Sequence, residues 1–489
     1  MLKLTSADLQ KTTIDTLVIP VCEDGSLHED PVLIDLIAQA NKHPEFKAAS
    51  GDVLTLYDLP HVKSKRIVFL GIGQRAKIDP EGLRSFAGRA VKKALKDHLA
   101  RLLIAVPASA KVELEPAILL ESLLEGAFLA NYLFDTYKAD KKLRPLKQVH
   151  LWVPSPLVRR FGHLVSRVET ICASTQLARE WVNTPPNDKR PEQLARTLTA
   201  RARKAGLKVT VLGEPLLKKQ RFGALLAVAA GSRNKPRLVV MEYAPKSYNK
   251  TIALVGKGVT FDSGGINLKP TPGLKDMKID MAGAAAVAAT LIATARLKPK
   301  TRVVGLVPIV ENMVSGDATR PGDIVKSYAG KTVEIGNTDA EGRLILIDAM
   351  AYAIKKYKPD TMVDLATLTG ACMVALGDKI AGVFTQDQDL SDAIVAAGKK
   401  THERCWPMPL PEDYKETLKS DVADISNMSS SKYGGAVTAA LFLSEFVGPT
   451  RWAHIDIAGP VYAGKESDYC PPGATGFGVR LLCDLMERL

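Results

Sequence analysis

The sequence TIALVGKGVTFDSGGINLKP, residues 251–270, joins a short apolar run to a polar segment that contains several glycines. The run at 251–256 ends in glycine and predicts a buried strand. The segment that follows predicts a loop at the carboxyl end of that strand, and it contains Lys257, Asp262 and Lys269. Ligands of open α/β sheets bind beyond the carboxyl ends of the strands. We therefore expect functional side chains in this loop.

The same alternation of apolar runs and helical patterns extends in both directions from this loop. In the second part of the chain, strands are predicted at residues 207–212, 237–243, 302–310, 361–368 and 381–385, and helices at 282–297 and 344–357. In the first part, strands are predicted at 17–21, 66–73, 101–106 and 149–153, and helices at 83–99 and 116–137. Strands that alternate with helices indicate a mainly parallel sheet with helices on both faces.

A long periodic stretch at 157–182 ends at the paired prolines of NTPPN, residues 183–187, because paired prolines stop helices. The chain is therefore predicted to be an α/β protein of two domains, each a mainly parallel or mixed sheet flanked by helices. The predicted N-terminal domain spans residues 1–155, a connecting helix spans 156–182, and the larger C-terminal domain spans 183–489.

The composition is that of an ordinary globular protein. Hydrophobic residues make up 46% and charged residues 24% of the chain, which argues against a disordered protein, a collagen or a coiled-coil rod. No uncharged apolar run reaches about 18 residues, so no membrane span is expected. The N-terminus lacks the pattern of a signal peptide, so we expect a cytoplasmic protein.

The cysteines and the glycosylation sequons do not indicate a specific function. The six cysteines are scattered and form no CxxC pair, which excludes a cysteine zinc framework and favours buried thiols in a reducing compartment. Asn249 and Asn427 begin N-x-S/T sequons, which carry no meaning without a secretory signal.

The net charge of +13 is concentrated in one stretch. Residues 189–250 contain 15 basic and 3 acidic side chains. Such a stretch could hold nucleic acid through phosphate contacts, or it could be a solvated face or a subunit contact. Little aromatic interleaving is present for base stacking, so a solvated face is favoured.

Three further loops carry polar residues near predicted strands or helices. MKIDMAGAAAV, residues 277–287, places Asp280 at the start of an alanine-rich helix. NTDAEGRL, residues 337–344, places Asp339, Glu341 and Arg343 before another helix, and ATLTGA occupies residues 366–371.

Each residue also has an ordinary structural interpretation. Asp280 could be a helix N-cap. Asp339 and Glu341 could be a cap and a first-turn acid, and Lys257 and Lys269 could be surface lysines.

Taken together, the loops indicate a metal site. Four carboxylates at one end of a sheet repel each other and need a cation. Oxygen-rich ligand sets suit Mg²⁺, Mn²⁺ or Zn²⁺. The loops contain no histidine, which excludes an HExxH zinc site, and the chain has neither a Walker A motif nor a GxSxG elbow. A two-metal hydrolytic centre is the best chemical hypothesis.

At these residues the sequence resembles the leucyl aminopeptidase family of dinuclear-metal enzymes, which includes bacterial aminopeptidase A. The motifs that carry the resemblance are VGKGVTFDSGG at 255–265, MKIDMAGAA at 277–285, NTDAEGRL at 337–344, ATLTGA at 366–371 and WAHIDIAGP at 452–460. The resemblance covers the second domain. The first domain matches only in layout. That layout also resembles that of macro domains, which would make the domain a ligand-binding module, but none of its residues forms a convincing site, so a scaffolding or assembly role is favoured.

The resemblance implies two divalent metal ions per subunit, Zn²⁺ or Mn²⁺, with Mg²⁺ as an option in one site. One site would use Asp262, Asp339 and Glu341. The second would use Lys257, Asp262, Asp280 and Glu341, so that Asp262 and Glu341 bridge the two metals.

The resemblance also implies the catalytic and substrate-binding residues. Lys269 would face the scissile carbonyl, and Arg343 would hold a bicarbonate ion that acts as the base. Met277, Thr367 and Gly370 would contribute to the pocket for the first residue of the substrate. The implied activity is the release of N-terminal leucine and other apolar residues from short peptides with a free N-terminus.

The family forms hexamers, so the resemblance implies a homohexamer with enclosed active sites. Some bacterial relatives also bind DNA. An additional DNA-binding role is therefore the alternative function, and the basic stretch at 189–250 permits it.

Overall fold

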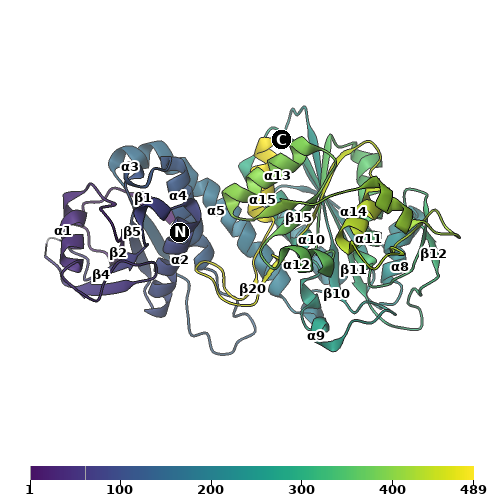
Figure 1. Ribbon diagram of the computed structural model, residues 1–489, viewed down its shortest axis with the longest axis horizontal. Coiled ribbons are helices and arrows are strands. Elements are labelled where there is room, and N and C mark those ends of the chain that lie inside the picture. The colour runs from purple at the N-terminus through teal and green to yellow at the C-terminus, as the bar shows by residue number, and fades with distance from the viewer. Residues whose placement is uncertain (1, 61) are drawn as a thin grey trace. The chain divides into compact units, whose positions relative to one another are not determined.

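The computed structural model describes residues 2–60 and 62–489 and divides into two compact units. The N-terminal unit comprises the chain up to Ala173 together with Lys465–Pro472, and the C-terminal unit comprises Ser174–Gly464 together with Gly473–Leu489. The division falls inside helix α5, Ser155–Asn183, which corresponds to the helix predicted at 156–182. Each unit is a sheet flanked by helices (Figure 1).

The N-terminal unit contains a six-stranded sheet in the order β1-β6-β5-β2-β4-β3. All neighbouring strands are parallel except β3, which is antiparallel to β4. The strands are β1 (Leu2–Thr5), β2 (Thr16–Val21), β3 (Val53–Tyr57), β4 (Arg66–Gly71), β5 (Arg101–Ala105) and β6 (Gln148–Trp152). The helices are α1 (Pro31–Ala40), α2 (Pro80–Lys96), α3 (Ser109–Val112) and α4 (Pro116–Ala130).

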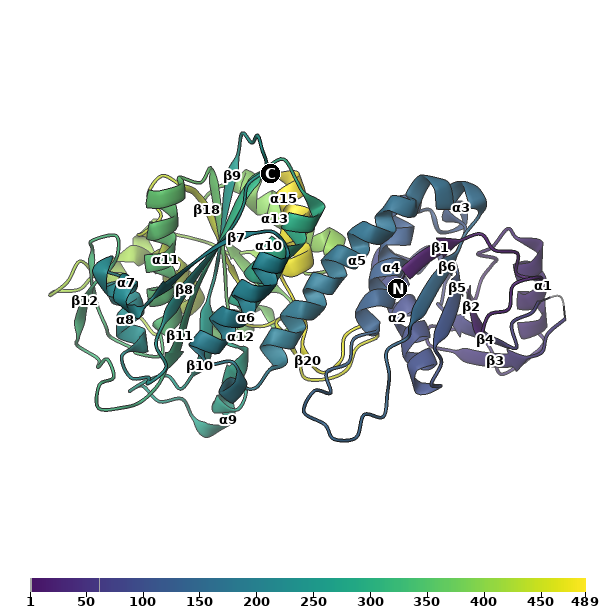
Figure 2. The same ribbon diagram turned by 180° about the vertical axis from the view of Figure 1, so that it is seen from behind.

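Alternation along the strands gives this sheet two apolar faces. Leu17 and Ile19 of β2 pack in the core that includes α1, whereas Val18 packs with α2 and α4. Figure 2 shows the sheet between these helices.

The C-terminal unit contains a nine-stranded mixed sheet in the order β16-β15-β18-β14-β9-β11-β8-β7, with β10 paired to β11. The central strands β18, β14, β9 and β11 are parallel to each other. Strands β15, β8 and β7 pair antiparallel with their inner neighbours. The strands of this sheet are β7 (Lys208–Gly213), β8 (Arg237–Tyr243), β9 (Thr251–Gly256), β10 (Gly258–Asp262), β11 (Arg302–Asn312), β14 (Thr361–Ala366), β15 (Ala381–Phe384), β16 (Cys405–Pro407) and β18 (Arg451–Asp456).

Helices cover both faces of this sheet. The helices of the C-terminal unit after α5 are α6 (Pro191–Lys204), α7 (Glu214–Lys219), α8 (Gly223–Ala229), α9 (Thr271–Leu274), α10 (Ala282–Leu297), α11 (Glu341–Tyr357), α12 (Gly370–Leu376), α13 (Gln388–Thr401), α14 (Gly435–Ser444) and α15 (Val479–Arg488). Ile252 and Leu254 of β9 pack in the core that includes α6, α10, α13 and α15, whereas Ala253 and Val255 pack with α8, α11 and α14. Short strands β12 (Ile324–Lys326), β13 (Thr332–Glu334) and β17 (Ile425–Ser426) form a small separate sheet, and β19 (Tyr462–Ala463) pairs with β20 (Gly473–Ala474).

Helix α10 lies in the core and has the bounds predicted from the sequence. Its small residues permit close packing: a Cβ atom on Gly283 would lie 2.1 Å from the backbone oxygen of Leu365. The segment Met277–Leu297 is long and apolar enough to cross a membrane, but 83% of its apolar window is buried inside the protein. It is therefore a core helix, because a helix that is apolar all round is buried either in a protein or in a bilayer.

The predicted fold class, two α/β units with parallel or mixed sheets and flanking helices, is confirmed. Several predicted helix ends are wrong. The helix predicted at 83–99 lies three residues earlier, at Pro80–Lys96. The helix predicted at 116–137 ends at Ala130, because Asn131 leaves the helix and its side chain bonds the backbone N–H and C=O of Leu146. The helix predicted at 344–357 begins three residues earlier, at Glu341. All six cysteines are buried, as expected.

Candidate metal centre

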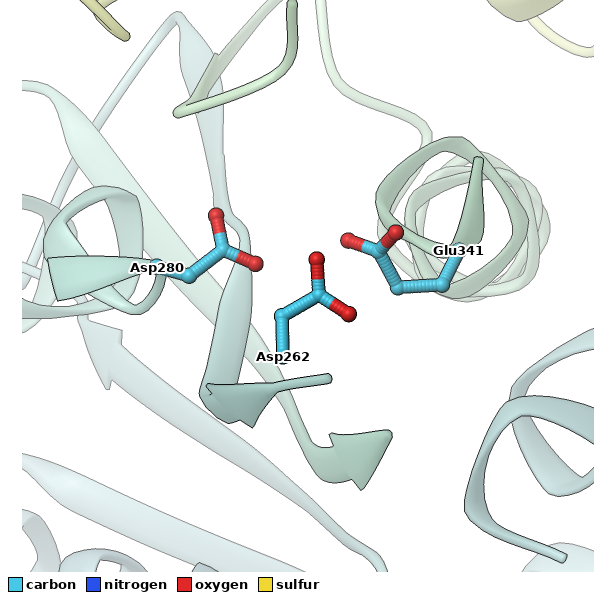
Figure 3. A group of neighbouring side chains, drawn as sticks. All are labelled: Asp262, Asp280 and Glu341. Atoms are coloured by element: carbon cyan, nitrogen blue, oxygen red, sulfur yellow. The ribbon is translucent and has the colours of Figure 1, made fainter. Parts of the chain in front are cut away.

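Three carboxylates converge near the carboxyl ends of the central strands of the C-terminal unit. Asp262 ends β10, Asp280 lies between the helical turn Met277–Ile279 and α10, and Glu341 begins α11. One oxygen from each lies within 4.8 Å of the others, and Figure 3 shows the carboxylates gathered around a common space. All three are buried, with exposed fractions of 2%, 4% and 2%. The sequence predicts that Asp262, Asp280 and Glu341 lie together, although up to 79 positions separate them along the chain.

Lys257 connects two of these carboxylates. Its Nζ lies 2.8 Å from Asp280 Oδ1 and 2.8 Å from Glu341 Oε1, and it donates a 2.7 Å hydrogen bond to the backbone oxygen of Thr367. Burial lowers the pKa of Lys257, but the carboxylates raise it by more, so the pKa lies above its ordinary value. The alternative that Lys257 is a surface lysine is wrong, since it is 3% exposed.

Gly342 makes room for Lys257. A Cβ atom at this position would lie 2.6 Å from Lys257 Cε and 2.7 Å from its Nζ. The glycine of the NTDAEGRL motif therefore lets the lysine side chain lie against the first turn of α11.

Lys269 and Asp339 lie at the more exposed side of the cluster. Lys269 Nζ lies 2.9 Å from Asp262 Oδ2 and also contacts Asp339 Oδ1. The side chains of Lys269 and Asp339 are 19% and 32% exposed, against 2% for Asp262. Burial lowers the pKa of Lys269, but Asp262, Asp339 and Glu341 raise it by more. Lys269 is therefore a cation that solvent and small molecules can approach.

The charge and hydrogen bonding of the cluster fit a bound divalent cation. Four carboxylates contact only two ammonium groups among the described residues, which leaves negative charge uncompensated. Burial and the neighbouring Asp262 carboxylate raise the pKa of Asp280 and of Glu341, whereas Lys257 opposes both shifts. Asp280 Oδ2 is buried and accepts no hydrogen bond from the part of the chain that the structure describes. A buried, unpartnered carboxylate oxygen is costly unless it coordinates a cation.

Neighbouring polar groups orient these carboxylates. Asn312, at the end of β11, donates from Nδ2 to Asp262 Oδ1 at 2.8 Å and to the Thr338 carbonyl at 3.0 Å. Thr367 donates from its hydroxyl to Asp280 Oδ1 at 2.7 Å. Asn312 is not among the predicted site residues, although a polar residue at the end of the apolar strand RVVGLVPIVEN is a usable signal.

The capping interpretations of these acids are mostly wrong. Asp280 is not an N-cap, because α10 begins after Met281 and no side chain caps it. Asp339 is not an N-cap either, because Ala340 holds that position in α11. Glu341 does lie in the first turn of α11, where the helix dipole favours an acid, and it contacts Lys257 as well.

Arg343 lies half-buried on α11 near the cluster. Its Nη1 donates a 2.8 Å hydrogen bond to the backbone oxygen of Asn427, and the guanidinium lies 5.9 Å from the centre of the Phe442 ring. Its Nε is buried and has no hydrogen-bond partner among residues 2–60 and 62–489. Burial lowers the pKa of Arg343 and Glu341 opposes the shift, and the guanidinium stays cationic at neutral pH. An unpartnered donor on a cation fits a small anion.

The three residues predicted for the substrate pocket lie on neighbouring segments. Met277 is half-buried, three residues before Asp280, and Gly370 is exposed at the start of α12. Thr367 is buried, and both its carbonyl and its hydroxyl bind residues of the cluster. Thr367 therefore has a structural role, and its place in the substrate pocket stays a prediction.

The basic stretch at 189–250 forms several partly exposed ion pairs with the few acids near it. Examples are Lys218 with Glu214 at 2.9 Å and Arg237 with Glu192 at 3.5 Å. Lys189 is buried and donates to the carbonyls of the last turn of α5. Nucleic-acid binding by this stretch stays a prediction.

Comparison with known proteins identifies the family. Residues 176–483 match the catalytic domain of the cytosol aminopeptidase family, and residues 18–141 match its N-terminal domain. A probable cytosol aminopeptidase of Chlorobium luteolum is 41% identical over 507 residues, covering 99% of each chain. One of Geobacter sp. (strain M21) is 42% identical over 479 residues, covering 96% of each chain. The solved structure of the bottromycin maturation enzyme BotP in complex with Mn superimposes with a TM-score of 0.87 at 32% identity, covering 97% of this chain and 99% of that one. The chain therefore belongs to the cytosol aminopeptidase family.

Proposed function

We propose that this chain is an aminopeptidase that holds two divalent metal ions, Zn²⁺ or Mn²⁺ with Mg²⁺ as an option in one site, between the carboxylates of the cluster. Asp262, Asp339 and Glu341 would hold one ion, and Lys257, Asp262, Asp280 and Glu341 the other. The 4.8 Å clustering of Asp262, Asp280 and Glu341 and the unpartnered oxygen of Asp280 support this assignment. Bound cations of this kind supply Lewis acidity that activates water and polarises a carbonyl group.

The two cationic side chains have separate roles in the proposed reaction. Lys269, whose pKa is raised, donates to the oxygen of the scissile carbonyl as negative charge develops there. Arg343 holds a bicarbonate ion through its free Nε–H. The N-terminus of α11, which begins at Glu341, favours an anion at the same place.

The proposed substrates are short peptides with a free N-terminus, with leucine and other apolar residues preferred at the first position. Met277, Thr367 and Gly370 contribute to the pocket for that residue, since methionine and small residues make an adaptable apolar surface. We further propose a cytoplasmic homohexamer, as in the family.

The observation that carries the proposal is the buried carboxylate cluster with an oxygen that lacks a donor, in a chain of this family. The test is hydrolysis of leucine-p-nitroanilide by protein dialysed against a chelator and resupplied with Mn²⁺ or Zn²⁺. We expect metal-restored activity that is absent on the N-acetylated substrate. Equal hydrolysis of both substrates would refute the requirement for a free amine.

A further inference from the structure

Asn427 is distant in sequence from the motif NTDAEGRL but forms several hydrogen bonds with it. It follows the short strand β17, and its side chain is 0% exposed. It begins a sequon, but its burial leaves no room for a glycan.

The Asn427 side chain binds the backbone of the loop before α11 on both donor and acceptor sides. Its Oδ1 accepts from the N–H groups of Gly336 at 2.8 Å and Asn337 at 3.2 Å. Its Nδ2 donates to the carbonyl of Asn337 at 2.8 Å and, more weakly, to that of Ala340 at 3.4 Å. An amide is the side chain that can satisfy both donors and acceptors of a backbone segment at once.

The backbone of Asn427 holds a second functional group. Its carbonyl oxygen accepts the 2.8 Å hydrogen bond from Arg343 Nη1, and its own N–H donates to the Glu334 carbonyl at 2.9 Å. One residue therefore contacts both the loop that carries Asp339 and the guanidinium of Arg343.

The opposite side of the same loop is attached to the segment that carries Asp262 and Lys269. Thr338 donates from its hydroxyl to the Gly264 carbonyl at 2.7 Å, and its N–H donates to Asn267 Oδ1 at 2.9 Å. The loop is thus hydrogen-bonded to two segments, and Asn427 is the residue that bonds both the loop and Arg343.

We propose that Asn427 is a positioning residue that fixes Asp339 and Arg343 relative to each other, and so sets both the metal site and the anion site. This inference rests on the proposed function, in which Asp339 holds metal and Arg343 holds bicarbonate. It goes beyond that function because Asn427 itself touches neither metal nor substrate.

The test variant is Asn427→Asp, which keeps the shape and the acceptor but loses the Nδ2 donor and places a carboxylate oxygen against the Asn337 carbonyl. Asn427→Ala is the second variant, and it gives the same readouts if the aspartate variant does not fold. The matched control is Asn131→Asp in the N-terminal unit, because Asn131 likewise accepts from a backbone N–H, at 2.7 Å, and donates to a backbone carbonyl, at 3.0 Å.

The readouts are Mn²⁺ affinity by calorimetry on metal-free protein, the bicarbonate concentration for half-maximal activity, and the melting temperature. We expect the Asn427 variants to bind the weaker of two Mn²⁺ ions about 10- to 100-fold less tightly, the range typical for groups that orient metal ligands, and to need more bicarbonate. Asn131→Asp should lower the melting temperature while leaving Mn²⁺ affinity and bicarbonate response at wild-type values.

Two outcomes would overturn the proposal, and they are distinguishable. If the wild-type protein binds two Mn²⁺ ions and the Asn427 variants change only the melting temperature, as Asn131→Asp does, the positioning role is wrong. If the wild-type protein binds no Mn²⁺, the proposed function fails and the role of Asn427 fails with it.

Discussion

Replacing Gly342 with alanine tests the packing of Lys257 against α11. The backbone of Gly342 has no positive φ angle, so alanine fits the helix conformation. The added Cβ would lie 2.6, 2.7 and 2.8 Å from Lys257 Cε, Nζ and Cδ. Non-bonded carbon atoms pack at about 3.5–4.0 Å, so the end of Lys257 must move by about 1 Å and lose its contacts with Asp280 and Glu341.

The expected effects on stability and on activity differ in size. Overpacking costs about 1–3 kcal/mol, and the better helix propensity of alanine offsets about 1 kcal/mol of that cost. The free energy of unfolding should therefore fall by no more than about 2 kcal/mol. A displacement of about 1 Å at a reacting site can lower the rate about 100-fold, so kcat should fall about that much and metal affinity should weaken.

The assay combines kcat for leucine-p-nitroanilide, metal content after dialysis, and urea unfolding. The control is Gly162→Ala in α5, where the added Cβ meets no heavy atom within 4 Å from the described residues other than its chain neighbours and the helix's own backbone. This control should gain up to about 1 kcal/mol of stability and keep wild-type kcat. Wild-type kcat and metal content in Gly342→Ala would refute the packing argument.

Three further predictions concern other residues of the C-terminal unit. Lys269→Ala and Arg343→Ala should each lower kcat by about 10²–10³-fold, because each removes a group that stabilises developing charge. The circular dichroism spectrum should stay unchanged. Wild-type kcat in both variants would contradict the proposed roles of the two residues. Asp262→Asn should lose bound metal, and finding two ions per chain by mass spectrometry would show that Asp262 does not bridge them. Asp364 Oδ1 lies 2.7 Å from His454 Nδ1. Burial lowers the pKa of His454, but the Asp364 carboxylate raises it by more. The pKa of His454 in the folded protein therefore lies above its ordinary value. The pair therefore stabilises the fold fully below about pH 6.5, and this stability is lost as pH rises through the folded pKa. Asp364→Asn should cost about 3–5 kcal/mol and flatten that pH dependence in urea unfolding; an unchanged slope would contradict the pairing.

Much of the fold could be predicted from local patterns. The strands β9 and β14 and the helix α10 are continuous apolar segments with clear ends. The sequence predicts a loop at Gly258–Asp262, but the structure has strand β10 there. The strand is short, contains glycine and pairs with β11 through an irregular register, so its pattern does not predict a strand.

The carboxylate cluster could be predicted because each acid follows or precedes an element whose end lies at the same sheet edge. Asn312 ends β11 and offers the same kind of signal, but Asn427 could not be predicted in this way. Asn427 binds groups 84 to 91 residues away in the sequence, and neither periodicity nor motif spacing records such contacts. Asp456 lies in the motif at 452–460, but the motif does not record that its carboxylate accepts from the Leu368 N–H and the Thr369 hydroxyl.

The most direct test of the central claim is a titration of chelator-treated protein with Mn²⁺, with leucine-p-nitroanilide hydrolysis measured at each ratio of metal to chain. The proposed two-metal centre predicts no hydrolysis without metal and a rise to a plateau at two ions per chain. Full hydrolysis by the metal-free protein, or no hydrolysis with two ions bound, would contradict the claim that the Asp262, Asp280 and Glu341 cluster is the catalytic metal centre.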